Sequence, residues 1–471
     1  MTTTTADPIA GRHPLSPWNT RWALAITSLA LFMTTLDNLV VTMALPAIRR
    51  SLHASIQSLE WTVNAYTLTF AVLLLTGAAL GDRFGRRRMF LIGLAVFTAA
   101  SAAAALSPDT ALLIAARAVQ GAGAAIVLPL TLTLLSEATP PQGRGMALGI
   151  WSGVSGLGVA IGALAGGAVV QGLDWHWIFW INVPVGIALL PLARTRLAES
   201  RGPSRRLDLP GLALAGAGLL GVTYAVIRGQ DLGWTSAGIL LPMAAGVAAL
   251  AAFAWWEVKS AAPMLPMRFF RSRAFSAANA VSLAMYFGVF GSIFLLAQFL
   301  QTAQGYSPLE AGLRTLPWTG MPILIAPFAG MLSDRIGSRP LLAAGLAMQA
   351  TAIAWLAAIL SPTVSYTLLV VPFALAGAGM ALVFAPAANT VLASVAPAEA
   401  GQASGATNAI REFGGVLGVA ILASVFSAHG SYATPASFAA GLTAALPVGA
   451  AFLAAGALIA LLVPRLSREH E

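Results

Sequence analysis

Two side chains of opposite charge lie inside long apolar stretches of this sequence. Asp37 stands in the segment TLDNL, and Arg117 stands in the segment IAARA. Ionisable groups inside membrane hydrocarbon are costly, and they usually serve transport or proton transfer. We predict that Asp37 binds and releases a proton and that Arg117 tunes its proton affinity. The alternative interpretation is a static buried ion pair whose members only satisfy each other.

The composition indicates that these stretches lie in a membrane. Of the 471 residues, 58% are hydrophobic and only 9% are charged, and the mean hydropathy is +0.80. Soluble domains carry about 25% charged residues, so a water-soluble enzyme of this size is excluded, and the apolar content also excludes disorder. Because the chain has no cysteine, it has no disulfide, thiolate metal site or catalytic thiol.

Fourteen apolar stretches are long enough to cross a bilayer, which takes about 20 residues. The sequence therefore predicts an all-α polytopic membrane protein with 14 transmembrane helices. The predicted spans are 21–46, 57–80, 88–107, 110–136, 145–171, 176–194, 209–228, 236–257, 275–302, 309–332, 340–361, 364–394, 402–428 and 440–464. At 1.5 Å per residue, Asp37 and Arg117 lie roughly 14 Å and 12 Å from the same outer face, so the two can pair if their helices are neighbours.

The basic residues predict the orientation of these spans. Most of the 26 Lys and Arg residues fall in inner segments if the amino terminus lies inside, as the positive-inside rule requires. We therefore expect both termini in the cytoplasm and a bacterial inner (cell) membrane as the location. The positive-inside rule accounts for the excess of basic residues, so this excess does not indicate nucleic-acid binding. We expect the polar residues 1–20 to form a tail and not a secretory signal.

Three short motifs occur twice in the same order, which indicates an internal repeat. The pairs are 81–87 with 333–339, 121–123 with 377–379, and 158–161 with 418–421. Spans 1–6 thus resemble spans 9–14 in the same orientation, and spans 7 and 8 are inserted between them. Parallel six-span repeats are a transporter architecture in which the substrate binds between the halves.

The repeat also predicts the domain organisation. Two six-helix bundles are separated by linkers and two inserted helices, and a short tail lies at each end. The predicted boundaries are 1–20 for the first tail, 21–194 for the first bundle, 195–274 for the insertion, 275–464 for the second bundle and 465–471 for the last tail.

The repeated motif Asp-Arg-x-Gly places charges on two predicted inner loops. A glycine permits a tight turn, and the aspartate can meet an arginine or a helix amino terminus. A gating role and a simple topology anchor are both open. The candidate gating residues are Asp82, Arg83, Gly85, Arg86, Arg87, Asp334, Arg335, Gly337 and Arg339.

Two further groups of residues could serve transport or only helix packing. Gly158, Gly162, Gly166 and Gly167 form a smooth stripe on the span 145–171, which suits either close packing or a coupling role. Several polar residues could line a substrate cavity, although each could instead bridge two helices. These candidates are Asn64, Tyr66, Gln120, Asn389 and Asn408.

Other chemistry is absent from the sequence. No G-x-x-x-x-G-K-[ST] loop is present, so neither ATP hydrolysis nor an ATPase partner is implied. The five histidines show no metal-ligand spacing. We expect no metal, no cofactor other than protons as the coupling ion, and no enzymatic activity.

These motifs together resemble the major facilitator superfamily, and within it the fourteen-span drug:proton antiporter branch, over residues 20–465. The segment 36–46 is similar to the span-1 signature L-D-x-T-V-V-N-V-A-L-P, with Leu39 and Thr42 as departures. The segment 81–88 resembles the gating loop, although Ala78 stands where an earlier glycine is expected.

Two more segments carry the resemblance. The segment 113–123 matches the span-4 pattern whose arginine, here Arg117, is implicated in proton transfer. The segment 158–167 fits the antiporter motif G-x-x-x-G-P-x-x-G-G, except that Ala163 replaces the proline. Because this motif is associated with exporters, the departure leaves the direction of transport open.

The resemblance implies a proton-coupled exporter in the lipid bilayer that moves small lipophilic or cationic drugs, dyes or antibiotics by alternating access. One alternative is a transporter dedicated to one metabolite or self-made antibiotic, and a panel of unrelated cations would distinguish it. A second alternative is a non-transporting membrane sensor or scaffold, which would tolerate neutralisation of Asp37.

Overall fold

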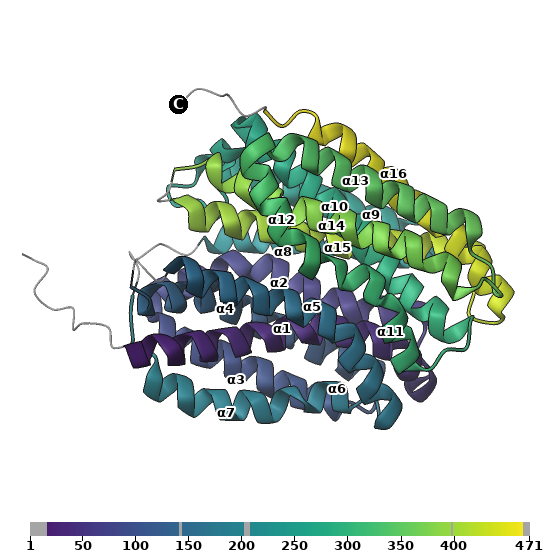
Figure 1. Cartoon of the computed structure of the whole chain (residues 1–471), viewed down its shortest axis with the longest axis horizontal. Coiled ribbons are helices and arrows are strands. Elements are labelled where there is room, and N and C mark those ends of the chain that lie inside the picture. Colours follow the sequence, from purple (N-terminus) through teal and green to yellow (C-terminus); the bar gives the residue numbers. More distant parts are fainter. Residues whose placement is uncertain (1–16, 141–143, 202–207, 397–398, 465–471) are drawn as a thin grey trace, which may run out of the picture.

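A computed structural model describes residues 17–140, 144–201, 208–396 and 399–464 (Figure 1). Every regular element in these ranges is a helix, which confirms the predicted all-α class. The predicted tails 1–20 and 465–471 lie outside the described residues, except for 17–20, which begin the first helix. Long apolar sequences favour helices in lipid because a helix satisfies its backbone hydrogen bonds internally.

The first group of helices, here called the first bundle, packs around α4. Helices α2 and α3 lie against α4, while α1 lies against α4, α5 and α7. The side chains of Ser55 and Asp109 cap the amino ends of α2 and α4, which supplies partners for otherwise orphaned backbone N–H groups. The elements are α1 (Pro17–Leu52), α2 (Ile56–Phe84), α3 (Arg86–Ala105), α4 (Thr110–Ala138), α5 (Arg144–Gly172), α6 (Trp177–Trp180) and α7 (Asn182–Arg196).

The second bundle repeats this arrangement later in the chain. Helix α10 packs on α14, α15 and α16, and α13 packs on α14 and α16. A 3₁₀ turn, η2 (Met267–Arg271), precedes it. Its elements are α10 (Arg273–Thr302), α11 (Pro308–Thr319), α12 (Met321–Ile336), α13 (Ser338–Ile359), α14 (Tyr366–Ala393), α15 (Ala400–His429) and α16 (Pro435–Ala460).

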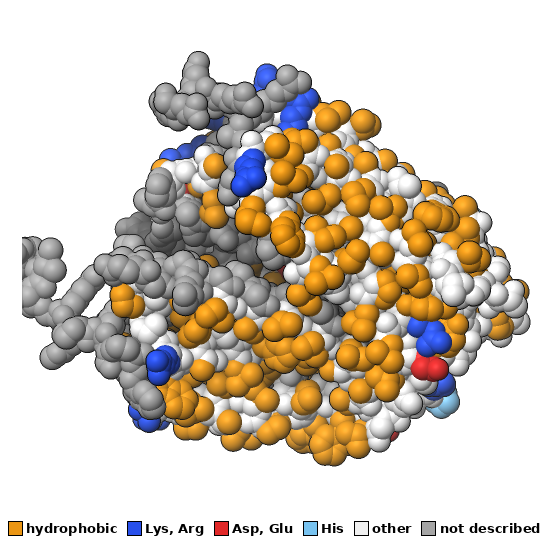
Figure 2. Space-filling model, in the orientation of Figure 1, with side chains coloured by type: hydrophobic (Ala, Val, Ile, Leu, Met, Phe, Trp, Pro, Cys, Tyr) orange, Lys and Arg blue, Asp and Glu red, His pale blue; other side chains and the backbone are white. Residues whose placement is uncertain are grey.

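Helices α8 (Leu209–Leu232) and α9 (Ala237–Lys259) form a hairpin between the two bundles in sequence. Helix α8 also packs on α2 of the first bundle and on α15 of the second. Only 11% of the apolar window of α9 is buried, so this helix presents most of its apolar surface outward. Figure 2 shows hydrophobic side chains spread over one face of both bundles, with charged side chains gathered towards its two ends.

Eleven described helices are long and apolar enough to cross a membrane. The count becomes twelve if the two parts of α2, 56–74 and 76–84, which meet at 51°, form one span. The predicted spans 145–171 and 309–332 are helical, as α5 and as the pair α11 and α12, but they are not among the eleven. The structure therefore supports eleven or twelve spans, and the predicted fourteen are not confirmed.

The two bundles are in contact at one end of the molecule. Helix α1 begins and helix α16 ends at the same end of the molecule in Figure 1, here called the terminal end, and the bundles diverge towards it. At the opposite end, here called the far end, Gln301 Nε2 donates to the Met43 carbonyl (3.0 Å) and the Leu309 N–H donates to Gln171 Oε1 (3.2 Å). These two hydrogen bonds join the bundles at the far end.

Candidate ion-coupling site

Asp37 and Arg117 meet inside the first bundle, although 80 residues separate them. Asp37 lies on α1 and Arg117 on α4, and their side chains are 1% and 0% exposed. The Arg117 guanidinium donates from Nη1 to Asp37 Oδ2. The similar depths expected from the sequence therefore do correspond to a direct contact between neighbouring helices.

The other carboxylate oxygen of Asp37 is held by two side-chain amides. Gln120 Nε2 donates to Oδ1 over 2.9 Å, and Asn182 Nδ2 donates to the same atom over 2.8 Å. Both amides also reach Ser101 Oγ, at 3.2 Å and 3.0 Å. Asp37, Ser101, Arg117, Gln120 and Asn182 thus form one connected set, here called the Asp37 network.

Arg117 has further partners of its own. Its Nε donates to the Thr62 carbonyl (3.2 Å), and Nη1 also donates to Gln120 Oε1 (2.8 Å). The guanidinium lies 4.3 Å from the centre of the Tyr66 ring, a cation–π arrangement. Nη2 is buried and has no hydrogen-bond partner in the described part of the chain. A buried donor without a partner is unusual, and it gives Arg117 a free position for a second acceptor.

The Asp37 network lies among α1, α3, α4 and α7, all in the first bundle. It does not lie between the bundles. A change at Asp37 would therefore act on the packing of four helices of one bundle. If the carboxylate lost its charge, Arg117 would remain as a buried cation without its counter-ion, which is strongly unfavourable. The arrangement can therefore couple the charge of Asp37 to the relative positions of these four helices.

Ser101 and Asn182 were not expected from the sequence as members of this site. Ser101 lies on α3 and donates to the Phe179 carbonyl (3.0 Å), and Asn182 is the first residue of α7. Asn182 is only 1% exposed. The amide of Asn182, inside an otherwise apolar predicted span, indicated a polar contact within the membrane. Its partner Asp37 on α1 could not be predicted, because helix packing decides which side chains meet.

The first candidate gating loop is tied to its own bundle. Asp82 Oδ1 accepts from Arg86 Nε (2.9 Å) and Nη2 (2.6 Å), and Arg86 also pairs with Glu137 on α4. Gly85 has φ of 107°, a conformation that favours glycine. Glu199 accepts from the backbone N–H of Arg87 (3.0 Å). Arg83 extends outward with its guanidinium 5.3 Å from the Phe84 ring.

The second candidate gating loop has the same turn but different contacts. Gly337 also has a positive φ, 84°, and Ser333 Oγ lies 3.0 Å from Ser338 Oγ. The side chain of Asp334 is outside the described residues. Arg335 is exposed and Arg339 is half-buried, and neither forms an ion pair with a described residue. The two loops share their turn geometry, and Ser338 stands at the position that corresponds to Arg86 of the first loop.

The glycine stripe of α5 packs on two different neighbours. A Cβ on Gly158 would lie 3.1 Å from Thr35 Cβ, and one on Gly166 would lie 2.9 Å from Val40 Cα, so both allow α5 to approach α1. A Cβ on Gly167 would lie 2.3 Å from the Pro308 carbonyl oxygen of the second bundle. Gly162 is buried. The stripe therefore serves packing within the first bundle and, at Gly167, contact between the bundles.

The five candidate cavity residues do not form a single group. Gln120 belongs to the Asp37 network, and the Tyr66 hydroxyl donates to the Thr34 carbonyl (3.4 Å). Asn64 is fully buried, and neither polar atom of its side chain has a partner in the described ranges. Asn389 is exposed and Asn408 is half-buried.

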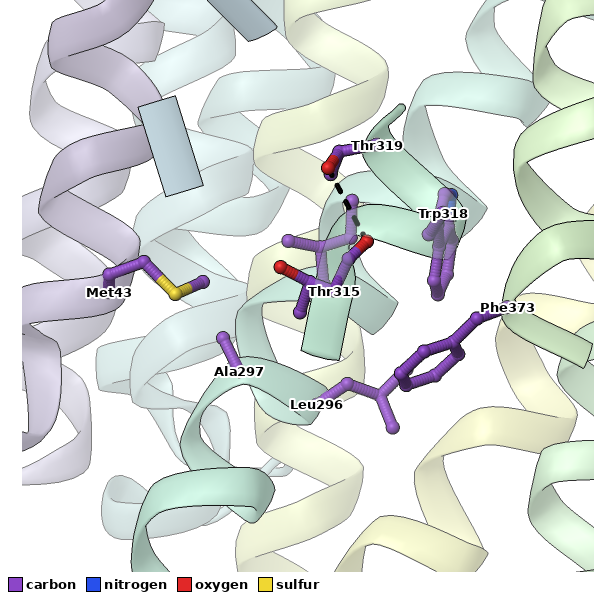
Figure 3. A pocket seen from close by; sticks show the side chains of 8 residues that line it. Met43, Leu296, Ala297, Thr315, Trp318, Thr319 and Phe373 are labelled. Atoms are coloured by element: carbon purple, nitrogen blue, oxygen red, sulfur yellow. Dashed lines mark hydrogen bonds between the residues drawn. The ribbon is translucent and has the colours of Figure 1, made fainter. Parts of the chain in front are cut away.

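A small apolar cavity lies where α1 faces the second bundle (Figure 3). Met43 contributes from α1, and Leu296, Trp318 and Phe373 contribute from the opposite side. Its volume is about 10 Å³, which is close to the space of one water molecule. In the conformation seen here, this cavity is too small for a drug.

Comparison with known proteins identifies the superfamily. The family model described as Major Facilitator Superfamily matches residues 27–419 and 278–470. The cephamycin export protein of Amycolatopsis lactamdurans is 39% identical over 457 residues, which cover 95% of this chain and 93% of that protein. The multidrug resistance protein Stp of Mycobacterium tuberculosis is 37% identical over 407 residues, which cover 86% of this chain and 75% of that protein.

Solved structures share the fold at low sequence identity. The crystal structure of the POT family transporter PepTSo aligns with a TM-score of 0.72 and 15% identity, covering 96% of this chain and 98% of that one. A bacterial homologue of the human lysosomal transporter Spinster aligns with a TM-score of 0.68 and 17% identity, covering 95% and 97% of the two chains. Both alignments cover nearly the whole helical assembly.

Proposed function

This chain belongs to the major facilitator superfamily, and we propose that it exports drugs or antibiotics across the bacterial inner membrane in exchange for protons. The names of its relatives, which include a multidrug resistance protein and a cephamycin export protein, support export as the activity. The observation that carries proton coupling is the buried Asp37 network. A membrane carboxylate with an arginine partner is a group that can exchange a proton.

In the proposed cycle, a proton binds a carboxylate oxygen of Asp37 and removes its negative charge. The bond from Arg117 then weakens, and the guanidinium turns to other acceptors, such as the Thr62 carbonyl that Nε already contacts. Because α1, α3, α4 and α7 share the network, this change alters how the first bundle packs. Release of the proton on the other side restores the pair and resets the bundle.

The substrate binds between the two bundles in this proposal, as in other transporters with parallel repeats. The terminal end is the cytoplasmic end, according to the distribution of basic residues. The contacts Gln301–Met43 and Leu309–Gln171 then close the outer side, and the divergence of the bundles opens the inner side. In this orientation, the conformation receives substrate from the cytoplasm.

We also propose fourteen spans. Helix α2 counts as one bent span, α5 as another, and the pair α11 and α12 as a third that is broken at Gly320. Broken helices are tolerated in transporters where protein covers the exposed backbone. With these three spans, each bundle has six, and the α8–α9 hairpin supplies the remaining two. No ATPase partner is required.

The proposal can be tested in inside-out vesicles with an acidic lumen and a fluorescent pH probe. Puromycin, cephamycin and tetraphenylphosphonium are added in turn to vesicles that contain wild type, Asp37→Asn or the control Asp231→Asn, which alters an exposed carboxylate. We expect at least one compound to release protons from the lumen in wild type and in the control but not in Asp37→Asn. An equal response in Asp37→Asn would exclude Asp37 from coupling, and silence with every compound would contradict multidrug antiport.

A dedicated exporter is the second candidate function. Several relatives are named for one compound each, including the tetracenomycin C resistance and export protein of Streptomyces glaucescens, which is 36% identical over 422 residues, covering 89% of this chain and 77% of that protein. A dedicated exporter would respond to one compound of a wide panel and to none of the unrelated cations. A multidrug exporter would respond to several.

A further inference from the structure

A second pair of charged residues lies deep in the second bundle, on α15. Arg411 and Glu412 follow the first residue of this helix, Ala400, by eleven and twelve positions, which is roughly 16–18 Å along the axis. A bilayer core is about 30 Å thick, so both residues lie near its middle. The first bundle has no charge at the repeat-related positions, where Trp151 and Ser152 stand.

Arg411 is buried without the partners that a buried guanidinium normally has. It is 9% exposed, and both Nε and Nη2 are buried without a hydrogen-bond partner in the described ranges. Its central carbon lies 5.9 Å from the ring centres of Tyr286 on α10 and Phe384 on α14. These two rings contact each other edge to face, with 6.0 Å between centres. The aromatic contacts hold the cation but do not satisfy its N–H groups.

Glu412 forms no ion pair with its neighbour Arg411. No ion pair within 4.0 Å joins the Glu412 carboxylate to any described basic residue, and it accepts no hydrogen bond from one. The side chain is half-buried, on a helix that packs on α2 of the first bundle. Asn408, one turn earlier on α15, is also half-buried.

A buried charge without a hydrogen-bond partner is strongly unfavourable, and a ligand that supplies the missing acceptors would relieve this cost. Planar guanidinium groups match carboxylates, because two N–H donors can bind two oxygens. We propose that Arg411 anchors the carboxylate of an aromatic or cyclic organic acid, with the rings of Tyr286, Phe290 and Phe384 against its apolar part. Phe290 stacks on Tyr286 with 5.1 Å between ring centres.

This inference rests on the proposed export function and makes it more specific, because it names acidic molecules as a substrate class. It differs from the lipophilic cations that the sequence resemblance implies. The position of Glu412 sharpens the distinction. A negative charge beside the anchor opposes an anionic ligand and attracts a cationic one, so removing it must change the two affinities in opposite directions.

The test measures binding to the purified full-length protein in detergent, without any proton gradient. Three probes share one ring system and carry a negative, a neutral or a positive group: 2-naphthoate, its amide 2-naphthamide, and 2-naphthylmethylammonium. Equilibrium binding of each tritiated probe is measured for wild type, Arg411→Gln, Arg411→Lys and Glu412→Gln. Arg228→Gln changes an exposed arginine on α8 and serves as the control variant.

We expect wild type to bind the carboxylate at least tenfold more tightly than the ammonium probe. Arg411→Gln should lose about tenfold for 2-naphthoate while 2-naphthamide is unchanged, which is roughly the loss of one charge-assisted pair. Arg411→Lys should keep part of the affinity, and Glu412→Gln should bind 2-naphthoate more tightly and the ammonium probe more weakly. Arg228→Gln should behave as wild type.

Tighter binding of the ammonium probe in wild type would overturn the proposal, as would unchanged 2-naphthoate binding in Arg411→Gln. Arg411→Gln could fail to be monodisperse on size-exclusion chromatography. In that case the test is the Glu412→Gln variant, whose affinities for 2-naphthoate and for the ammonium probe should change in opposite directions. If they do not, the proposed site is rejected. Binding does not depend on transport. Carboxylate binding with silent vesicles would contradict antiport alone, and proton release with no carboxylate binding would contradict Arg411 alone.

Discussion

The side-chain amide of Asn182 donates to Oδ1 of Asp37 over 2.8 Å, although 145 residues separate the two in the chain. This bond ties the start of α7 to the middle of α1, and the same amide also reaches Ser101 on α3. The carboxylate is thus connected to helices at the outside of the first bundle as well as to Arg117. A change of charge at Asp37 would therefore change the strength of a hydrogen bond that holds α7.

Replacement of Asn182 by Leu should weaken coupling without abolishing it. The change leaves Asp37 bound to Arg117 and Gln120 but removes one donor from a buried oxygen, and it should destabilise the protein by about 1–3 kcal/mol. We expect less substrate-driven proton release in vesicles and a lower thermal unfolding temperature in detergent. Gln230→Leu, at an exposed amide on α8, is the control. Equal behaviour of the two variants would show that the bond to Asp37 has no role.

Neutralising one member of the Asp37–Arg117 pair should be worse for stability than neutralising both. Arg117→Gln leaves a buried carboxylate without its cation, which costs about 3–5 kcal/mol, whereas Asp37→Asn with Arg117→Gln leaves two neutral amides in the same place. We expect the double variant to recover a large part of the thermal stability that Arg117→Gln loses, but none of the coupling.

A double-mutant cycle on unfolding in detergent measures this interaction directly. The cycle needs wild type, the two single variants and the double variant under the same conditions. Additive losses would show that the two groups do not stabilise each other, in spite of their contact.

Arg86→Gln tests whether the first loop acts as a gate or only as an anchor. The Arg86 side chain is 14% exposed, and its partners Asp82 and Glu137 are 20% and 39% exposed, so pairs in this setting contribute about 0–1 kcal/mol. A gating role predicts a transport rate reduced several-fold with nearly unchanged thermal stability. Lys259→Gln, at another basic residue of the terminal end, is the comparison. If both variants transport as wild type does, the loop is an anchor.

The sequence was sufficient to predict the helical class, the repeat and the meeting of Asp37 with Arg117. Each of these follows from apolar length, motif order or depth along a helix, which are one-dimensional properties. Asn182, Ser101 and Glu137 could not be assigned to their partners, because the rotation of a helix about its axis decides which side chain it presents to which neighbour. The span at α11–α12 is also unconfirmed, because the helix is interrupted at Gly320 and neither α11 nor α12 is long enough to cross a membrane alone.

The two loops show a second limit of sequence repeats. Gly85 and Gly337 have the same positive φ range, because a tight turn demands glycine wherever the motif occurs. The ion pairs of Arg86 depend on Glu137, which lies on a different helix. The second loop has Ser338 in place of Arg86, so the repeated motif predicts the turn but does not repeat the residue that forms these ion pairs.

The last prediction concerns the contact between the bundles at Gly167. A Cβ there would lie 2.3 Å from the Pro308 carbonyl oxygen, and backbone on both sides leaves little room to adjust. Gly167→Ala should therefore separate α5 from α11 and favour a conformation that is open at the far end. Gly172→Ala, where no atom lies within 4 Å of the added Cβ, should have no such effect.

Because the chain contains no cysteine, spin labels can be placed without further changes. Labels on cysteines at positions 50 and 433, both exposed at the far end on different bundles, report the separation there by pulsed electron paramagnetic resonance. We expect a longer mean distance in Gly167→Ala than in wild type, and an unchanged distance in Gly172→Ala. An unchanged distance in Gly167→Ala would show that this close approach does not hold the far end closed.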